Sequence, residues 1–247
     1  MKILRYTRSI AMHDVSFDCI CNNETKSADE GDGAAMSGGS AATNGQVAAG
    51  TALRQQLDGG GTTGSRATAL DALKVAHRWF QAGRRIDIQA IAAELGVSRV
   101  TLHRWVGTRE QLLVEVLWLN ADRSIDRTAD AVRQDSPPAS WTAEILSRWA
   151  ADVVRHPGIR HLQESEADLL ARLLTRDASE FQRRMIEKVA GLLADDIAAG
   201  RVTIELEPAE LAYATVRIVE SFVHTPAITG GAPDPQQNAR VLRALLR

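Results

Sequence analysis

The sequence predicts an all-α protein of about nine helices, and three observations carry that prediction. From residue 65 onward, apolar residues recur at the spacing of amphipathic helices. No segment alternates apolar and polar residues between turn signals, as a strand would. Residues 87–113 contain two short helical patterns joined at a glycine, which is typical of a helix-turn-helix. We therefore expect a disordered tail (1–64), a three-helix helix-turn-helix domain (65–120) and a helical domain (121–247).

The composition is that of an ordinary globular protein. The 247 residues are 45% hydrophobic and 24% charged, which excludes collagen-like, mucin-like and fully disordered chains. Lys and Arg number 29 and Asp and Glu 31, giving a net charge of −2. Bulk charge thus indicates neither nucleic-acid nor membrane binding, and any basic surface must be local.

The cysteines and the lengths of the apolar runs indicate the cellular compartment and the absence of a metal site. Cys19 and Cys21 have no further cysteines with which to form a disulfide framework or a zinc site. The N-terminal stretch lacks the apolar core of a signal peptide, and no run of 18 apolar residues occurs. We expect a cytoplasmic protein with no metal, no cofactor and no membrane contact.

Residues 1–64 have the composition of a tail. Ten of the 18 glycines lie between Gly31 and Gly64, among Ser, Ala, Thr and Asp. Such a stretch buries too little apolar surface to offset its ordering entropy. The sequence therefore predicts disorder here, although a short helix around Thr51–Leu57 is compatible with the pattern.

Helix boundaries follow from capping residues. Asp87 and Ser98 are good N-caps, Thr108 with Gln111 forms a capping box, and Pro208 suits a first helical position. The predicted helices cover residues 66–82, 88–95, 99–106, 108–131, 140–155, 159–174, 178–199 and 208–224, and a last helix ends at Arg247.

The stretch with the most functional content is DIQAIAAELGVSRVTLHRWVGTREQLL, residues 87–113. Its second helix is short and begins with small and polar residues, as does a helix that enters the major groove of DNA by its N-terminal end. Residues 65–123 hold nine basic and six acidic side chains, a local excess of three positive charges. An ordinary helical hairpin with a solvated basic face has the same pattern, so periodicity alone leaves both interpretations open.

The helical spacing separates core residues from candidate DNA contacts. Leu102 and Val106 are four residues apart and are expected to face the core. Arg99 then points outward, where its guanidinium matches a guanine edge, and Val100 is placed to contact a thymine methyl. The other predicted contacts, to phosphates or bases, are Ser98, Thr101, His103, Arg104, Arg109 and Trp105, with Trp105 alternatively closing the core.

The segment GVSRVTLHRWVGTREQLL resembles the recognition segment of TetR-type regulators. That family typically reads Gly-Val-Ser, two variable positions, Thr-Leu-Tyr, a short polar–aromatic stretch, Lys-Glu and a Leu pair. The resemblance implies a three-helix DNA-binding domain, a connecting helix, and a C-terminal helical domain for ligand binding and dimerisation. The matching residues are Gly96, Val97, Ser98, Thr101, Leu102, Glu110, Leu112 and Leu113.

Three positions depart from the family pattern. His103 stands where Tyr is usual, Val100 where Gly or Ala is common, and Arg109 where Lys is common. The wording HRWVGTREQLL, with ESFVHTPAITGGAPD near the end of the chain, resembles a subgroup related to QsdR, a regulator of quorum-signal degradation.

Two C-terminal helices are apolar on more than one face, which is typical of buried helices. They bury either within their own domain or against a second copy of the chain. We expect a symmetric homodimer through both helices, because two-fold symmetry suits a palindromic operator. The residues concerned are Leu211, Val216, Ile218, Val219, Phe222 and Val223 in one helix and Val241, Leu242, Leu245 and Leu246 in the other.

Candidate ligand-binding residues come from charged pairs at helical spacing and from tryptophans. Such residues usually form satisfied ion pairs or core contacts, so the structural interpretation stays open beside ligand binding. The candidates are Trp118, Trp149, His161, Glu164, Arg217, Glu220 and His224.

The sequence thus predicts a ligand-responsive transcriptional regulator, a repressor in most of the family. It would bind a palindromic operator in double-stranded DNA as a dimer and be released by a small, largely apolar effector. One alternative is a dimeric interaction module without sequence-specific DNA binding. The other is a helical enzyme, for which no nucleophile elbow, metal signature or Gly-rich cofactor loop is present. Its candidate groups would be His161, Glu164, Glu166, Asp168, Glu220 and His224.

Overall fold

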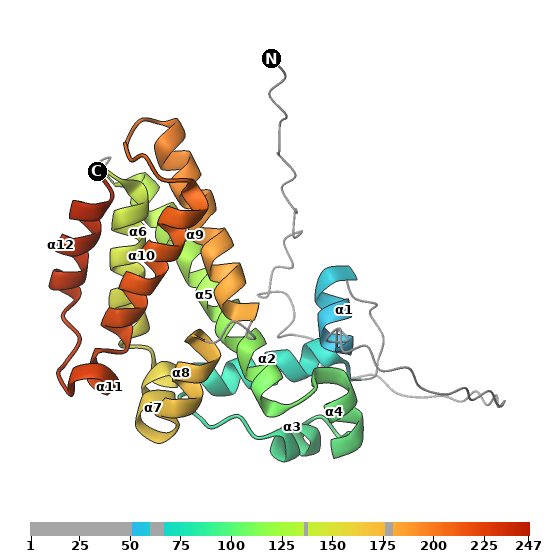
Figure 1. Ribbon diagram of the computed structural model, residues 1–247. Coiled ribbons are helices and arrows are strands. Elements are labelled where there is room, and N and C mark those ends of the chain that lie inside the picture. Colours follow the sequence, from blue (N-terminus) through green and yellow to red (C-terminus); the bar gives the residue numbers. More distant parts are fainter. Residues whose placement is uncertain (1–50, 60–66, 136–137, 176–179) are drawn as a thin grey trace, which may run out of the picture. The chain divides into compact units, whose positions relative to one another are not determined.

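The computed structural model describes residues 51–59, 67–135, 138–175 and 180–247, and these ranges are helical apart from turns and connections (Figure 1). The prediction of an all-α fold is confirmed. The helices are α1 (Ala52–Gly59), α2 (Ala69–Gln81), α3 (Ile88–Glu94), α4 (Arg99–Val106), α5 (Arg109–Gln134), α6 (Trp141–Val153), α7 (Pro157–Ser165), α8 (Ala167–Thr175), α9 (Glu180–Ala198), α10 (Pro208–Val223), α11 (Thr225–Thr229) and α12 (Pro235–Leu245).

All nine predicted helices are present, and the described residues hold three more because of local breaks. The predicted helix 159–174 is divided at Glu166, whose φ of −147° and ψ of 44° lie outside the helical region. This break separates α7 from α8. The short helix α11 follows α10 and ends at Gly230, which has a φ of +70°.

The third additional helix, α1, lies within the range predicted as a tail. It stands where the sequence is compatible with a short helix, and it packs against α2 and α4. Leu53 of α1 has no exposed surface. Residues 51–59 are therefore part of the folded core, whereas residues 1–50 and 60–64 of the predicted tail lie outside the described residues.

Helices α2, α3 and α4 form the predicted three-helix unit, and its caps are those read from the sequence. The Asp87 carboxylate accepts a hydrogen bond from the Ala90 amide at 2.8 Å, and the Ser98 hydroxyl accepts one from the Thr101 amide at 3.0 Å. Between α3 and α4, Gly96 has a φ of +65°, a conformation that glycine adopts without strain.

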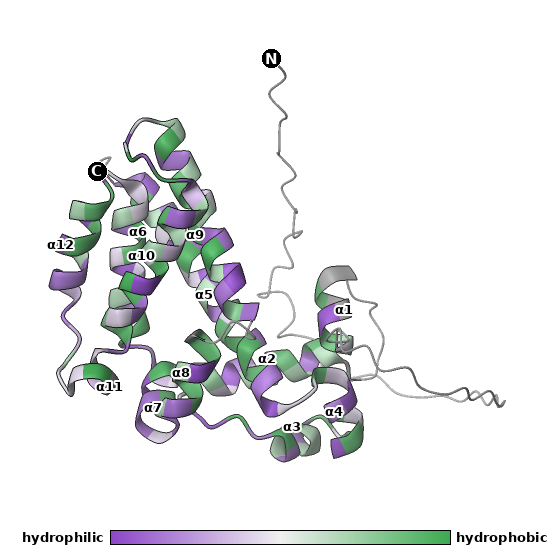
Figure 2. Cartoon of the chain, in the orientation of Figure 1, coloured by the Kyte–Doolittle hydropathy of each residue, from purple (hydrophilic) through white to green (hydrophobic). Residues whose placement is uncertain are grey.

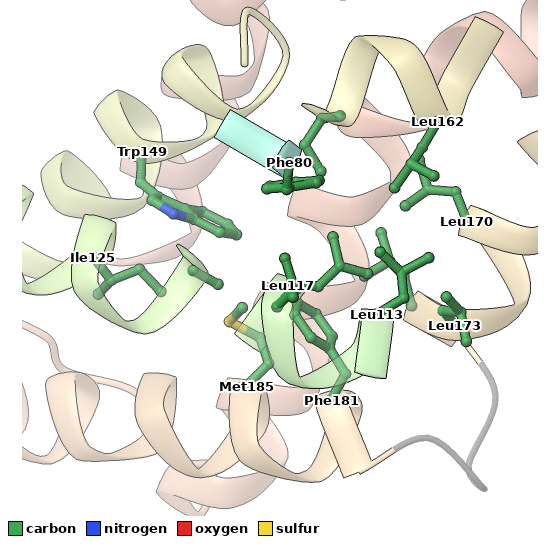
Figure 3. Close-up of a cluster of buried hydrophobic side chains, with 14 of the residues drawn as sticks. Phe80, Leu113, Leu117, Ile125, Trp149, Leu162, Leu170, Leu173, Phe181 and Met185 are labelled. Carbon is green, nitrogen blue, oxygen red and sulfur yellow. The ribbon is translucent and has the colours of Figure 1, made fainter. Parts of the chain in front are cut away.

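The second group of helices packs around α5. Helix α5 contacts α2, α4, α6 and α9, while α12 packs on α6 and α7 packs on α2. Figure 2 shows hydrophobic and hydrophilic residues interspersed along the helices, as in amphipathic helices. The core gathers side chains from α5, α6 and α9, among them Leu117, Trp149, Phe181 and Met185 (Figure 3).

The described residues hold neither a membrane-spanning helix nor a metal-binding cluster. None of the described helices is both long and apolar enough to cross a membrane. Within the same residues, no three His, Cys, Asp or Glu side chains are grouped so as to hold a metal ion.

Candidate DNA-binding surface and ligand cavity

Helix α4 presents a polar face to solvent from a firmly anchored position. Leu102 and Val106 have no exposed surface, as their spacing predicts. Arg99, His103 and Arg104 are exposed on the other side. An anchored helix with free arginine and histidine side chains has the properties needed to read a DNA groove.

Val100 is the most exposed large apolar side chain of the described residues, at 79%. It lies in the first turn of α4, beside Arg99. An apolar group held in water at this position costs free energy in the isolated protein. A thymine methyl in the major groove would give it an apolar contact.

Three other predicted DNA contacts of the helix-turn-helix unit differ in their surroundings. The hydroxyls of Ser98 and Thr101 lie 2.9 Å apart at the exposed start of α4. Trp105 is half-buried and packs on the core, which favours the core-closing interpretation of its ring. No DNA is present, so these DNA contacts stay predictions.

Arg109 is engaged within the protein. Its Nη1 and Nη2 donate to the two carboxylate oxygens of Glu166 at 2.7 and 2.6 Å, and its Nε donates to the Ile86 carbonyl at 2.6 Å. These bonds use the guanidinium edge that a DNA phosphate would need. In this conformation Arg109 joins the helix-turn-helix unit to the α7–α8 junction.

Glu166 responds electrostatically to this environment. Hydrogen bonds from Arg109 outweigh the effect of burial, and Arg85 lies 3.5 Å away, so the pKa of Glu166 is held below its usual range. The carboxylate is therefore ionised at neutral pH, as a bidentate pair with arginine requires.

An apolar cavity of about 50 Å³ lies between α5, α6, α9 and α10. Trp149, Phe181 and Met185 point toward it from two sides, as Figure 3 shows. Most of its other lining residues are Leu, Val and Ile. A cavity of this size and lining accommodates a few water molecules or a slender apolar group.

Glu220 is the one charged residue among the described residues that line the cavity. Its carboxylate lies 2.7 Å from Nη2 of Arg217 and accepts a hydrogen bond from the Gln182 amide. Gln182 also accepts one from Arg217, so the three side chains form a closed polar cluster. Burial outweighs both partners and raises the pKa of Glu220 to about 7.

This raised pKa predicts how Glu220→Gln changes stability. The folded state holds the Glu220 proton more tightly than the unfolded state, so the wild type loses stability as pH rises from about 4.5 to about 7. Glutamine mimics the protonated form. We expect the variant to match the wild type at pH 4.5 and to exceed its free energy of unfolding by roughly 2–3 kcal/mol at pH 8.

Urea unfolding at the two pH values measures this difference. Ser221→Ala, on the exposed side of the same helix, is the control and should show no pH-dependent change. A Glu220→Gln variant that is less stable by the same amount at both pH values would mean that Arg217 keeps the carboxylate ionised.

The seven predicted ligand residues fall in different places. Trp149 and Glu220 line the cavity, and Arg217 reaches it through Glu220. Trp118 lies outside the lining but packs edge-to-face on Phe181, with ring centroids 6.2 Å apart. Ligand contact itself stays a prediction for all of them.

The other three predicted residues lie away from the cavity lining. Glu164 is exposed and lies 3.6 Å from Arg160. His161 and His224 are half-buried, and the Nε2 atom of each has no hydrogen-bond partner among the described residues. No described hydrogen bond pairs His161 with Glu164.

A hydrogen-bond chain connects the cavity to the helix-turn-helix unit. Asn120 lines the cavity, and its Oδ1 accepts from Nε2 of Gln81, in the last turn of α2, at 2.9 Å. Oε1 of Gln81 lies 2.9 Å from Nε2 of His156, whose ring stacks on Phe80 with centroids 4.7 Å apart. Displacement of Asn120 by a ligand would therefore reach α2 through one hydrogen bond and His156 through a second.

Sequence reasoning did not find Asn120, Gln81, Gln182 or the Arg109–Glu166 pair as site residues. The partners in these contacts lie 35 to 57 positions away along the chain. No local pattern encodes such distances. The end of α7 at Glu166 could have marked this site, but the apolar spacing runs on through residues 159–174 and predicts one continuous helix.

Comparisons with known proteins agree with this architecture. Residues 139–247 match the family described as tetracyclin repressor-like, C-terminal domain. QsdR, a transcriptional repressor of R. erythropolis from the TetR family, is 25% identical, with a TM-score of 0.65 over 72% of this chain and 93% of QsdR.

A second similar structure is AlkX, a TetR-family repressor from Dietzia sp. strain DQ12-45-1b. It is 21% identical, with a TM-score of 0.53 over 74% of this chain and 95% of AlkX. The curated proteins give no match. The resemblance to TetR-type regulators is thus confirmed at the level of the fold: the chain has the fold of the TetR family, and its residues 139–247 match the tetracyclin repressor-like C-terminal domain.

Proposed function

We propose that the protein is a transcriptional repressor that binds a palindromic operator and is released by a small, largely apolar effector. The observation that carries this proposal is α4, with Arg99, Val100 and His103 exposed above a fully buried Leu102. Arg99 would read a guanine, and Val100 would contact a thymine methyl. Such a regulator would act on chromosomal DNA in the cytoplasm rather than as an enzyme.

A homodimer would supply the two-fold symmetry of a palindrome. Leu211, Val216 and Val219 of α10 are buried against the protein's own core. Tyr213 is 55% exposed, while Ile218 and Phe222 are half-buried, so α10 keeps a second, partly apolar face. We propose that this face, with α12 beside it, meets a second copy and sets the two α4 helices about 34–36 Å apart.

The effector would act from the cavity. A ligand that binds more tightly to a conformation with mis-spaced α4 helices shifts the population away from the DNA-bound state. Two sets of contacts join the cavity-bearing helices to the helix-turn-helix unit and would transmit this shift. They are the Asn120–Gln81–His156 hydrogen bonds and the Arg109–Glu166 pair. Both sets of contacts are what a ligand-responsive binding protein needs.

Selection of genomic fragments tests the proposal. Purified protein would capture sheared genomic DNA at about 150 mM salt, because phosphate contacts make affinity strongly salt-dependent. We expect an enriched palindrome with the wild type. Arg99→Ala combined with Thr101→Ala should lose it, since each base contact contributes about 1–3 kcal/mol.

Arg160→Ala is the control, because it removes an exposed arginine from α7, away from α4. It should select the same palindrome as the wild type. An enriched site without two-fold symmetry would contradict the dimer. No enrichment, or equal enrichment with the double variant, would contradict sequence reading by α4 and favour the interaction-module or enzyme alternatives.

A further inference from the structure

A second hollow opens beside the apolar cavity and is much larger, with a volume of about 440 Å³ against about 50 Å³. The two share Asn120, Trp149 and Val153 as lining residues. They therefore lie on two sides of the same side chains. We call the larger one the outer hollow, and its other lining residues are mainly polar or charged.

Trp149 forms the boundary between the two spaces. Its Nε1 donates to the Ser124 hydroxyl at 2.9 Å, and Ser124 lines the outer hollow. The indole is thus held from the polar side while its ring also faces the apolar cavity, as Figure 3 shows. A molecule that occupies both spaces would lie against the shared residues Asn120, Trp149 and Val153.

The charged residues of the outer hollow leave one positive charge uncompensated. Nη1 of Arg148 lies 2.6 Å from an Asp135 oxygen, and its Nε lies 2.7 Å from Glu144. Asp152 lies 3.7 Å from Arg155. Within the described ranges, no acidic group pairs with the exposed Arg127.

The arginines near the outer hollow also lower the pKa values of two histidines, His156 and His77. Burial and then the charge of Arg127 lower the pKa of His156. Burial, Arg123, His156 and Arg127 together lower the pKa of His77 to about 4. His156 already uses both ring nitrogens, because Nδ1 accepts from the Gly158 amide and Nε2 lies against Oε1 of Gln81. Both rings are neutral at pH 7, so the uncompensated positive charge of the outer hollow is that of Arg127.

We propose that the ligand is an amphiphile with a slender apolar chain and an anionic head group, a carboxylate or a phosphate. The chain lies past Trp149 in the narrow cavity, and the head lies in the outer hollow against Arg127. This inference rests on the proposed function only in taking the cavity as the effector site. The narrow cavity favours a linear chain over fused rings, and the unpaired guanidinium favours an anion over a neutral or cationic head.

Calorimetric titration with four probes of equal chain length tests the head group. Dodecanoate and dodecyl phosphate carry the two anionic heads, dodecanol a neutral one and dodecyltrimethylammonium a cationic one, all below their micelle-forming concentrations. We expect both anions to bind at least tenfold more tightly than dodecanol, and the cation to bind most weakly. Which anion binds more tightly identifies the head group.

Arg127→Gln should lower the affinity for the preferred anion about tenfold and leave dodecanol unchanged, because the exposed side chain contributes charge rather than packing. Arg133→Gln is the matched control, an exposed arginine of the same helix outside both spaces. It should leave all four affinities unchanged.

A chain-length series tests the tail in the wild type. From octanoate to decanoate the affinity should rise by roughly fourfold for each added methylene, the effect of burying an apolar group.

Equal binding of dodecanoate and dodecanol, an equal loss for both in Arg127→Gln, or affinity independent of chain length would each overturn the inference. Genomic selection contains no ligand, so the two proposals fail independently. Arg127-dependent binding without an operator would sustain this inference alone, and an operator without such binding would sustain only the proposed function.

Discussion

Replacing Gly158 by alanine is expected to cost about 3 kcal/mol of folding free energy, more than any other single methyl group we consider. A Cβ on Gly158 would lie 2.5 Å from two ring carbons of Phe80 and no farther from the Phe80 carbonyl oxygen. A carbonyl within helix α2 cannot move away without moving the helix. Helices α2 and α7 must therefore separate, or Pro157 and Gly158 must leave their positions.

The matched control for this substitution is Gly191→Ala in α9. A Cβ there meets nothing within 4 Å, and the residue lies inside a helix. Alanine should stabilise the protein by roughly 0.5–1 kcal/mol, because it restricts the unfolded chain and favours the helix. Urea unfolding of the two variants gives opposite signs if this contact holds. The same sign for both would mean that α7 does not press on α2 in solution.

The other large effect is expected at Asp196, whose carboxylate is fully buried. It accepts hydrogen bonds from the Thr142 amide at 2.8 Å, the Ser140 hydroxyl at 2.9 Å and Nε of Arg201 at 2.6 Å. It thus binds the start of α6 to the end of α9. Asp196→Ala leaves these donors without their acceptor and should cost about 3–5 kcal/mol.

The pH dependence of stability identifies this carboxylate. Burial opposes its ionisation, but the hydrogen bonds from Arg201, Thr142 and Ser140 outweigh burial and hold the pKa of Asp196 below its usual range. Its contribution is therefore complete above about pH 4, the ordinary aspartate range, and is lost as pH falls through the lower folded value. Wild type and Asp196→Ala should differ less in acid than at pH 7.

Two further variants separate the charge from the side chain's place in the core. Asp195→Ala removes the neighbouring exposed carboxylate and should change the free energy of unfolding by less than about 0.5 kcal/mol. Asp196→Asn keeps an acceptor oxygen and should cost less than alanine, without the acid dependence. Equal losses for alanine at positions 195 and 196 would contradict the structural role of Asp196.

Features that depend on residues close together in the sequence were predicted correctly. Asp87, Ser98 and the Thr108–Gln111 box cap the helices they were predicted to cap, because each cap spans three residues. The anchored face of α4 follows equally from the spacing of Leu102 and Val106.

Contacts between distant parts of the chain were not predictable in this way. A basic residue at the start of α5 reads as a DNA contact, and only the folded chain shows Arg109 facing Glu166, 57 positions later. The cavity, the outer hollow and the buried Asp196 arise from packing among several helices. The sequence allowed a short helix at α1, but the glycine-rich composition around its eight residues gave no sign that Leu53 is buried in the core.

The length of α5 would turn a small tilt beside the cavity into a larger displacement of the helix-turn-helix unit. Asn120 follows Arg109 by eleven residues, about 16 Å along the axis at 1.5 Å per residue. A tilt of about 10° at Asn120 would swing Arg109 by roughly 3 Å, close to the ~3.4 Å rise of one base pair. Because Arg109 donates a hydrogen bond to the Ile86 carbonyl, this movement would carry the helix-turn-helix unit with it. A ligand that tilts α5 by this amount would thus displace the helix-turn-helix unit by nearly one base-pair step along DNA.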